Sequence, residues 1–225
     1  MAGKFSTPRN PYVRKTRCAP RCEALEWTIS HHTNLIMAKR IIVGISGASG
    51  ALYAIRMLQK LRKSKYEVHL VVSDAAKITI SHECGHLLTM EQLYTDYCTH
   101  YHDVRSVGAS IASGSFKTIG MVVVPCSVRT MSEIAAGVTS NLLTRAADVV
   151  LKERGKLVLM LRETPLHLGY LRTMVSLAEM GAIIAPPIPS FYHHPKSLDD
   201  VVSNSVDRVL GMFDIQQELR EWQGI

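Results

Sequence analysis

The chain has 225 residues, of which 47% are hydrophobic and 20% are charged, and it carries a formal net charge of +7. Its length suits one α/β domain with a sizeable core, and no apolar run reaches the roughly 20 residues that would cross a bilayer. Six basic and two acidic residues precede Met37, so the rest of the chain has a net charge of only +3. Because its basic residues are scattered and not interleaved with aromatic ones, we expect small anionic ligands and no nucleic-acid partner.

The cysteines indicate a reducing compartment. There are five, at positions 18, 22, 84, 98 and 126, and an odd number without a secretory leader argues against a disulfide framework. Cys18 and Cys22 have the spacing of half a metal site, but no second pair follows, and structural zinc needs four ligands. We therefore expect free thiols, a cytoplasmic location and no metal at this pair.

Residues 1–36 read as a basic extension without stable structure. They contain Pro8, Pro11 and Pro20 and lack hydrophobic periodicity until Leu35. Met37 then resembles a start immediately before a strand, so we place the folded domain at residues 37–225. Two explanations for the extension stay open: translation from an upstream start codon, or a targeting peptide that would send the protein to an organellar matrix. Sparse serine favours the first explanation.

The first strand and helix enclose the most informative segment. A buried apolar run predicts a strand over residues 41–45, and an apolar helical face predicts a helix over residues 51–62. Gly44, Gly47 and Gly50 lie at and beyond the strand's end, where glycine lets the backbone approach an anion at the helix N-terminus. Their spacing differs from the dinucleotide pattern G-x-G-x-x-G, which favours a mononucleotide over NAD or FAD.

The later elements continue the alternation. A strand over residues 68–72 leads into a helix capped by Ser73 or Asp74, and two turns rich in Tyr and His are expected over residues 94–102. Residues 108–114 suggest a short helix within loops. The remaining expected elements are a strand at 119–124, a helix after residues 125–130, a helix at 142–153, a strand at 156–161, a helix at 168–180, a strand at 182–185 and a helix at 198–213.

Strands that are apolar on both faces and separated by helices predict a single doubly wound α/β domain. The sheet should be mainly parallel and Rossmann-like or flavodoxin-like, with helices on both faces. Ligands of such sheets bind beyond the carboxyl ends of the strands. Polar turns gather at that edge, at residues 47–50, 73, 125–130 and 162–165. Their hydroxyl groups suit the polar atoms of a flavin, and Arg162 suits a phosphate.

Five motifs in a fixed order resemble the UbiX family of flavin prenyltransferases. They lie at residues 44–50, 125–127, 143–154, 162–167 and 191–193, and the resemblance covers about residues 39–225. It implies transfer of a dimethylallyl group from dimethylallyl phosphate to N5 and C6 of reduced FMN. The product, prenylated FMN, would serve a partner UbiD-type decarboxylase in ubiquinone or aromatic-acid metabolism. The resemblance also implies a large homo-oligomer, such as a dodecamer, in which a neighbouring chain completes the flavin site.

The resemblance assigns roles to individual positions. The FMN-binding positions are Gly47, Ala48, Ser49, Ser73, Ser127, Val128, Arg129, Thr130 and Arg145. The dimethylallyl phosphate positions are Lys152, Arg162, Tyr192 and Arg208. Ser49 and Glu83 resemble the proton-handling positions, Glu163 is a further acid or base, and Trp222 could steady an allylic cation. Fixed cations beside the departing phosphate would stabilise its charge, so no metal is required.

Alternative interpretations stay open for several of these residues. Arg145 and Lys152 lie two helical turns apart and could form a solvated basic face, and Arg129 could bind FMN through its backbone alone. Histidines at positions 82, 86, 100, 102, 193 and 194 lack a recognised metal-ligand spacing. The alternative functions are an FMN-dependent decarboxylase of cysteine-type substrates, an aromatic-acid decarboxylase acting alone and a noncatalytic flavin-binding protein. The first typically has a different turn at residues 125–130 and a catalytic histidine.

Overall fold

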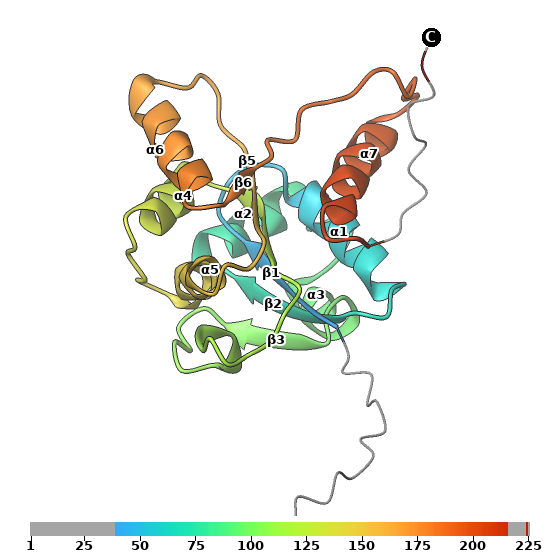
Figure 1. Cartoon of the computed structure of the whole chain (residues 1–225). Helices are drawn as coiled ribbons and strands as arrows, with labels where there is room; N and C mark the ends of the chain where they lie inside the picture. Colours follow the sequence, from blue (N-terminus) through green and yellow to red (C-terminus); the bar gives the residue numbers. More distant parts are fainter. Residues whose placement is uncertain (1–38, 216–223, 225) are drawn as a thin grey trace, which may run out of the picture. The chain divides into compact units, whose positions relative to one another are not determined.

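A computed structural model describes residues 39–215 and 224 of the chain (Figure 1). The chain divides into two units, Met1–Ile36 and Met37–Ile225. The extension expected over residues 1–36 and the position of Trp222 both lie outside the described residues. Within the described part, no helix is long and apolar enough to cross a membrane.

The centre of the described unit is a six-stranded sheet in which every pairing is parallel. The strand order is β3-β2-β1-β4-β5-β6, which confirms the doubly wound prediction. The order reverses between β1 and β4, and ligands of open α/β sheets bind at such a switch point. The strands are β1 (Arg40–Ile45), β2 (Glu67–Val72), β3 (His100–Asp103), β4 (Met121–Cys126), β5 (Leu157–Leu161) and β6 (Ile183–Ile184).

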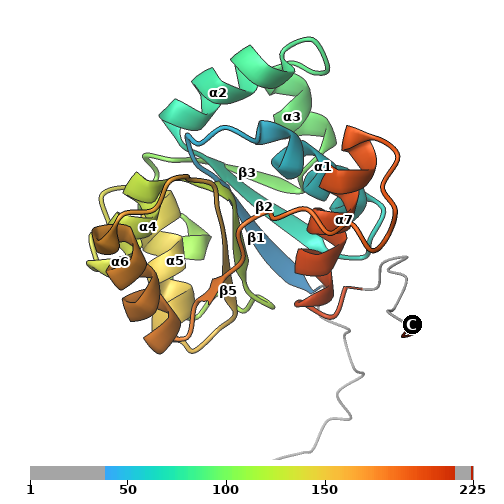
Figure 2. The same cartoon turned by 90° about the horizontal axis from the view of Figure 1, so that it is seen from above.

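Helices cover both faces of the sheet. In Figure 2, α1, α2, α3 and α7 lie on one side, and α4, α5 and α6 lie on the other. Successive strand residues point to opposite faces, so Ile41 and Val43 pack in the first core cluster and Ile42 in the second. The helices are α1 (Ala51–Arg62), α2 (Asp74–Cys84), α3 (Met90–Asp96), α4 (Val128–Ala135), α5 (Leu142–Lys152), α6 (Leu168–Glu179) and α7 (Leu198–Gly211), with a 3₁₀ turn at Ser110–Ala112.

Side-chain caps start several of these helices close to the ends of strands. The Ser73 hydroxyl accepts the N–H of Ala76 at 3.1 Å, which confirms the predicted cap of α2. The Ser127 hydroxyl accepts the N–H of Thr130 at 3.3 Å and starts α4 directly after β4. Such caps satisfy N–H groups that the first helical turn leaves unpaired, and here they place two helix N-termini at the carboxyl edge of the sheet.

The segment rich in Tyr and His differs from its prediction. Instead of two turns, it forms the end of α3 and the edge strand β3. Thr89 and Gln92 form a capping box that starts α3, and Leu93 is buried beneath it. The strand was missed because β3 has only four residues and borders the sheet on one side, so it lacks the apolar run that identifies a central strand. β4 also extends through Pro125 and Cys126, two residues beyond the predicted end at residue 124.

Candidate flavin site

The loop between β1 and α1 requires glycine for two separate reasons. Gly50 has a φ of 105°, a left-handed conformation that suits glycine, and it supplies no side-chain cap to α1. A Cβ atom on Gly47 would lie 2.4 Å from the Cβ of Ala75 in the first turn of α2. The loop therefore packs directly against a second helix N-terminus, while Gly47 itself stays exposed.

Glu83, from α2, caps α1 in place of the missing side chain. Its Oε2 atom accepts the N–H groups of Gly50 and Ala51, each at 2.9 Å. Burial raises the pKa of this carboxyl, but hydrogen bonds from the Ser49 hydroxyl and the two N–H groups, with Arg162 nearby, outweigh burial and lower the pKa below its ordinary value. Glu83 is therefore ionised at neutral pH and able to accept a proton.

Arg162 reaches the same loop from the end of β5. Its Nε atom donates to the carbonyl oxygen of Ser49 at 3.1 Å, and its backbone N–H donates to the carbonyl oxygen of Cys126 at 3.0 Å. Among the described residues, its two terminal nitrogens have no hydrogen-bond partner, so they are available to an anion. Ser49, Glu83 and Arg162, which are far apart in sequence, thus form one cluster at the helix N-terminus.

A hollow of about 450 Å³ opens beside this cluster at the carboxyl ends of β1 to β4. This volume is in the range of small-molecule sites, which is roughly 300–1,000 Å³. Five predicted FMN positions line it: Gly47, Ser73, Ser127, Arg129 and Thr130. Residues that the sequence did not assign to a ligand site complete the lining: Asp74, Ala75, Val104, Arg105, Glu133, Ser140 and Asn141.

The remaining hydroxyl and backbone groups fix the shape of the hollow. The buried Ser46 hydroxyl donates to the carbonyl oxygen of Pro125 at 2.9 Å and accepts the N–H of Ser127 at 2.7 Å. Sequence reasoning assigned no role to Ser46, which directly follows β1 within the motif at residues 44–50. Ala48 is buried and Val128 is half-buried, so any contact with a ligand there involves mainly the backbone.

Arg129 lies at the rim of the hollow with its side chain largely in solvent. Its guanidinium pairs with Glu133 at 2.8 Å, one helical turn along α4. Glu133 also accepts the hydroxyl of Ser140 at 3.0 Å. This arrangement engages the Arg129 side chain with its own helix.

Arg145 and Lys152 lie on α5, and the structure separates Lys152 from the cluster. Arg145 donates to the carbonyl oxygen of Ala112 at 3.3 Å and pairs with Asp148 at 2.8 Å. The helix starts beside the strand ends, where the Leu142 N–H donates to Val104 at 2.8 Å. Ten residues at about 1.5 Å each carry Lys152 roughly 15 Å toward the other edge of the sheet, where it pairs with Glu153.

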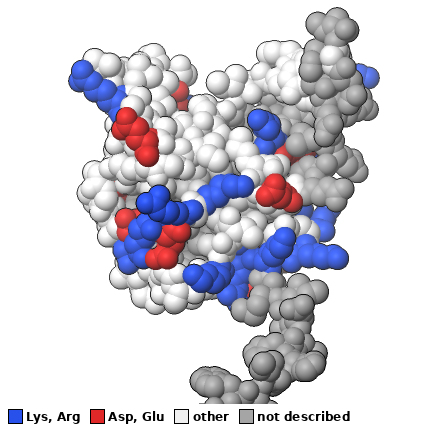
Figure 3. Space-filling view, viewed as in Figure 1, with Lys and Arg blue, Asp and Glu red and all other residues white. Residues whose placement is uncertain are grey.

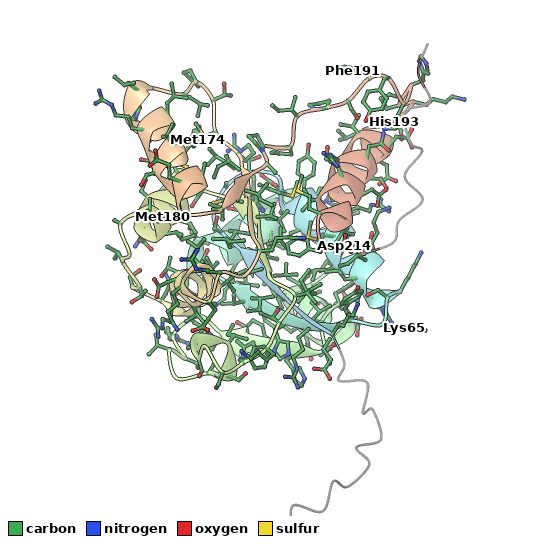
Figure 4. The ribbon with its side chains drawn as sticks, viewed as in Figure 1. Lys65, Met174, Met180, Phe191, His193 and Asp214 are labelled. Carbon is green, nitrogen blue, oxygen red and sulfur yellow. The ribbon has the colours of Figure 1, made fainter. Side chains whose placement is uncertain are left out.

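Tyr192 and Arg208 meet at a second hollow, of about 200 Å³, between the segment after β6 and helix α7. Figure 4 shows the neighbouring residues Phe191 and His193 on that segment. Arg162 does not line this hollow, so the four predicted phosphate-binding residues occupy three places within one chain. Glu163 follows Arg162 and is exposed, with its Oε1 atom accepting the N–H of Thr164 at 3.0 Å.

Exposed apolar side chains lie on α6 and on the segment before α7. Most of the surface in Figure 3 is neither basic nor acidic, and acidic groups lie among the basic ones. α6 has a single buried residue, Leu177, and exposes Leu168, Leu171 and Val175. Phe191 is 72% exposed on the segment before α7. Large exposed apolar groups, here on α6 and on the segment before α7, are typical of surfaces that another chain covers.

Comparison with known proteins first defines the class of this site. Residues 29–210 match the model of the Flavoprotein family, so the chain is a member of that family, as the parallel sheet and the hollow at its switch point also indicate. The chain is 55% identical over 190 residues to the flavin prenyltransferase UbiX of Escherichia coli K12, covering 83% of this chain and 99% of that protein. It belongs to the UbiX family of flavin prenyltransferases.

Solved structures agree with this assignment. A dodecameric FMN-dependent UbiX-like decarboxylase from Escherichia coli O157:H7 is 43% identical, with a TM-score of 0.79, covering 82% of this chain and all of that one. AnUbiX in complex with FMN and dimethylallyl pyrophosphate is 38% identical, with a TM-score of 0.78, covering 83% of this chain and all of that one.

Proposed function

We propose that this protein transfers a dimethylallyl group from dimethylallyl phosphate to N5 and C6 of reduced FMN. The observation that carries the proposal is the cluster of Ser49, Glu83 and Arg162 beside a flavin-sized hollow at the switch point. It joins a proton acceptor to a cation that can face a phosphate. The likeness to UbiX and to a relative that binds both FMN and dimethylallyl pyrophosphate supports the same reaction.

The residues around the hollow fit FMN. Gly47 lets the loop backbone approach, and the Ser73 and Ser127 hydroxyls, although they cap helices, also line the hollow. We assign Ala48, Ser49, Val128, Arg129, Thr130 and Arg145 to FMN binding with them. Reduced FMN supplies the nucleophilic N5 and C6 atoms when it is bound.

The chain's own groups handle the leaving phosphate and the protons. As the C–O bond of dimethylallyl phosphate breaks, the phosphate leaves with the electron pair, and Arg162 stabilises its negative charge. Tyr192 and Arg208 lie at a separate hollow within one chain, so we assign them to the same phosphate from a neighbouring copy. The Ser49 hydroxyl donates to the ionised Glu83 carboxylate, so a proton released beside Ser49 can pass to Glu83. Glu163 is a further proton carrier, and Trp222 is proposed to steady positive charge on the allyl group.

Lys152 would complete the phosphate site from a second copy of the chain. Within one chain it lies at the far end of α5, whereas the exposed apolar residues of α6 offer a surface on which another copy could pack. A dodecameric relative supports such an arrangement for this chain. We therefore propose a homo-oligomer whose subunits share each site.

The test is anaerobic incubation of the protein with reduced FMN and dimethylallyl phosphate, followed by mass spectrometry of the released flavin. We expect a flavin heavier by one five-carbon prenyl unit, its loss in Arg162→Ala and its retention in Lys65→Ala. Lys65 is an exposed cation that precedes β2, at the edge of the sheet opposite the carboxyl ends of the strands. A parallel reaction with the pyrophosphate distinguishes the two donors. Unmodified FMN despite flavin binding would refute the proposal and favour a cysteine-type decarboxylase or a flavin carrier.

We also propose that the product serves a UbiD-type decarboxylase in the cytoplasm. The three described cysteines, Cys84, Cys98 and Cys126, are free, which is consistent with a reducing compartment. The test of the partner is to add the released flavin to a UbiD-type apoenzyme and measure decarboxylation. Activation by the product but not by FMN would support this assignment, and equal activity with both would contradict it.

A further inference from the structure

A cluster of four polar side chains lies on one face of the β2–β3 pair, at the edge of the sheet. His69 on β2 is directly opposite His100 on β3, and their rings stack with centroids 4.6 Å apart. Glu67 and His102 lie two residues from these partners on their own strands. Because side chains two residues apart in a strand share a face, all four groups project to the same side.

His69 is the buried centre of this cluster and has an unpaired ring nitrogen. It is only 4% exposed, and its Nδ1 lies 2.9 Å from Nε2 of His102. Its Nε2 atom is buried and has no hydrogen-bond partner among the described residues. If Nδ1 carries the proton and donates to His102, Nε2 presents a free lone pair, and histidines that bind metals commonly donate their other ring N–H in this way.

Glu67 and His100 bring two further ligand atoms close to the His69 ring. One ligand atom from each of Glu67, His69 and His100 lies within 4.8 Å of the other two. Arg40 donates to Oε2 of Glu67 at 2.8 Å, which holds the carboxylate in place and leaves Oε1 for a ligand. Phe116 packs edge-on against His69 at 4.8 Å and closes one side of the cluster.

We propose that Glu67, His69 and His100 bind one Zn²⁺ ion, with a water molecule as the fourth ligand. Two imidazoles and one carboxylate suit zinc, whereas Mg²⁺ and Ca²⁺ prefer oxygen ligands only. The charge of Arg40 opposes any cation here, so a metal with strong affinity for imidazole is needed. The ion would join β3 to β2. His69 precedes Ser73 by four residues, which places it about 13 Å from the flavin hollow at 3.3 Å per residue, so the ion would take no part in prenyl transfer.

The test is a calorimetric titration of the chelator-treated full chain with Zn²⁺, compared with His100→Gln. His100 is exposed, so this variant should keep its fold, which circular dichroism checks. His86→Gln removes another exposed histidine and serves as the matched control. We expect the wild type and His86→Gln to share one site that His100→Gln weakens at least tenfold. Co²⁺ bound at the same site should give visible absorption that is lost in His100→Gln.

Comparison between variants separates this site from zinc bound elsewhere in the chain, for example by Cys18 and Cys22. Thermal unfolding gives a second readout, because zinc should raise the midpoint of the wild type more than that of His100→Gln. Identical zinc affinity and stoichiometry in the wild type and His100→Gln would overturn the proposal. It would also be overturned if the chelator-treated wild type bound no Zn²⁺.

Discussion

Replacing Glu83 by Gln tests whether the carboxylate charge holds the loop at the start of α1. The variant keeps an oxygen that can accept an N–H group, but it loses the charge that strengthens hydrogen bonds from Gly50, Ala51 and Ser49. Hydrogen bonds to a charged group contribute about 1.5–3 kcal/mol, and loss of a helix cap costs typically about 1 kcal/mol. Because the amide retains part of this interaction, we expect the unfolding free energy at pH 7 to fall by about 1–2 kcal/mol.

Urea denaturation at a series of pH values provides the assay. The pKa of Glu83 is lowered in the folded protein, so its stabilising effect is present above the ordinary carboxyl pKa of 4.5 and is lost as pH falls through the lower folded value. The difference between wild type and Glu83→Gln should therefore shrink below about pH 4. Glu91→Gln, in the first turn of α3, is the control for charge removal alone. The role assigned to Glu83 would be refuted if the difference in unfolding free energy between wild type and Glu83→Gln stayed constant with pH, or if Glu91→Gln lost an equal unfolding free energy.

Three further predictions follow from the same geometry. Gly47→Ala should lower the unfolding free energy by about 1–3 kcal/mol through overpacking against Ala75, and it should weaken FMN binding in a fluorescence titration. Gly108→Ala adds a Cβ atom that meets no atom within 4 Å, so it should do neither. Equal effects of the two variants would contradict the assigned contact. Burial, then His100 and His102, lower the pKa of His69 to about 4, so the unfolded chain binds more protons between pH 4 and 6.5. The unfolding free energy of metal-free protein should therefore fall by up to about 3 kcal/mol as the pH is lowered from 6.5 to 4. A similar fall in His69→Gln would exclude His69 as the cause. Lys152→Ala and Arg162→Ala should each be inactive. If two copies share each site, refolding equal amounts of the two variants together should restore about a quarter of the active sites. No recovery of activity would argue against sharing.

Local patterns predicted most of the fold because its central strands are buried on both faces. The helix at Ala51–Arg62 has the predicted bounds, and the predicted strand at 41–45 differs from β1 by one residue. These elements carry strong periodicity and clear turn residues between them. β3 lacked both advantages, since its pairing with β2 depends on a partner 31 residues away and not on its own hydrophobicity.

The site was less accessible to sequence reasoning than the fold. The helix caps Ser73 and Ser127 follow strands directly, so topology alone brings them to one edge. Glu83 was identified only through the family resemblance, because its bond to Gly50 spans 33 residues and nothing around it in sequence fixes its direction. Arg105 and Asn141 were missed for a similar reason, since they reach the hollow only through the packing of β3 and α5.

The Ser46 hydroxyl has a consequence for motion at the mouth of the flavin hollow. It bridges the ends of β1 and β4 by bonding both Pro125 and Ser127, beside a backbone bond from the Ser46 N–H to the Pro125 carbonyl oxygen at 3.3 Å. The two strand ends are therefore held together in the absence of a ligand, and any separation of them requires a buried hydrogen bond to break. Ordering of this edge is completed during folding, which leaves less conformational entropy to be lost when the flavin enters.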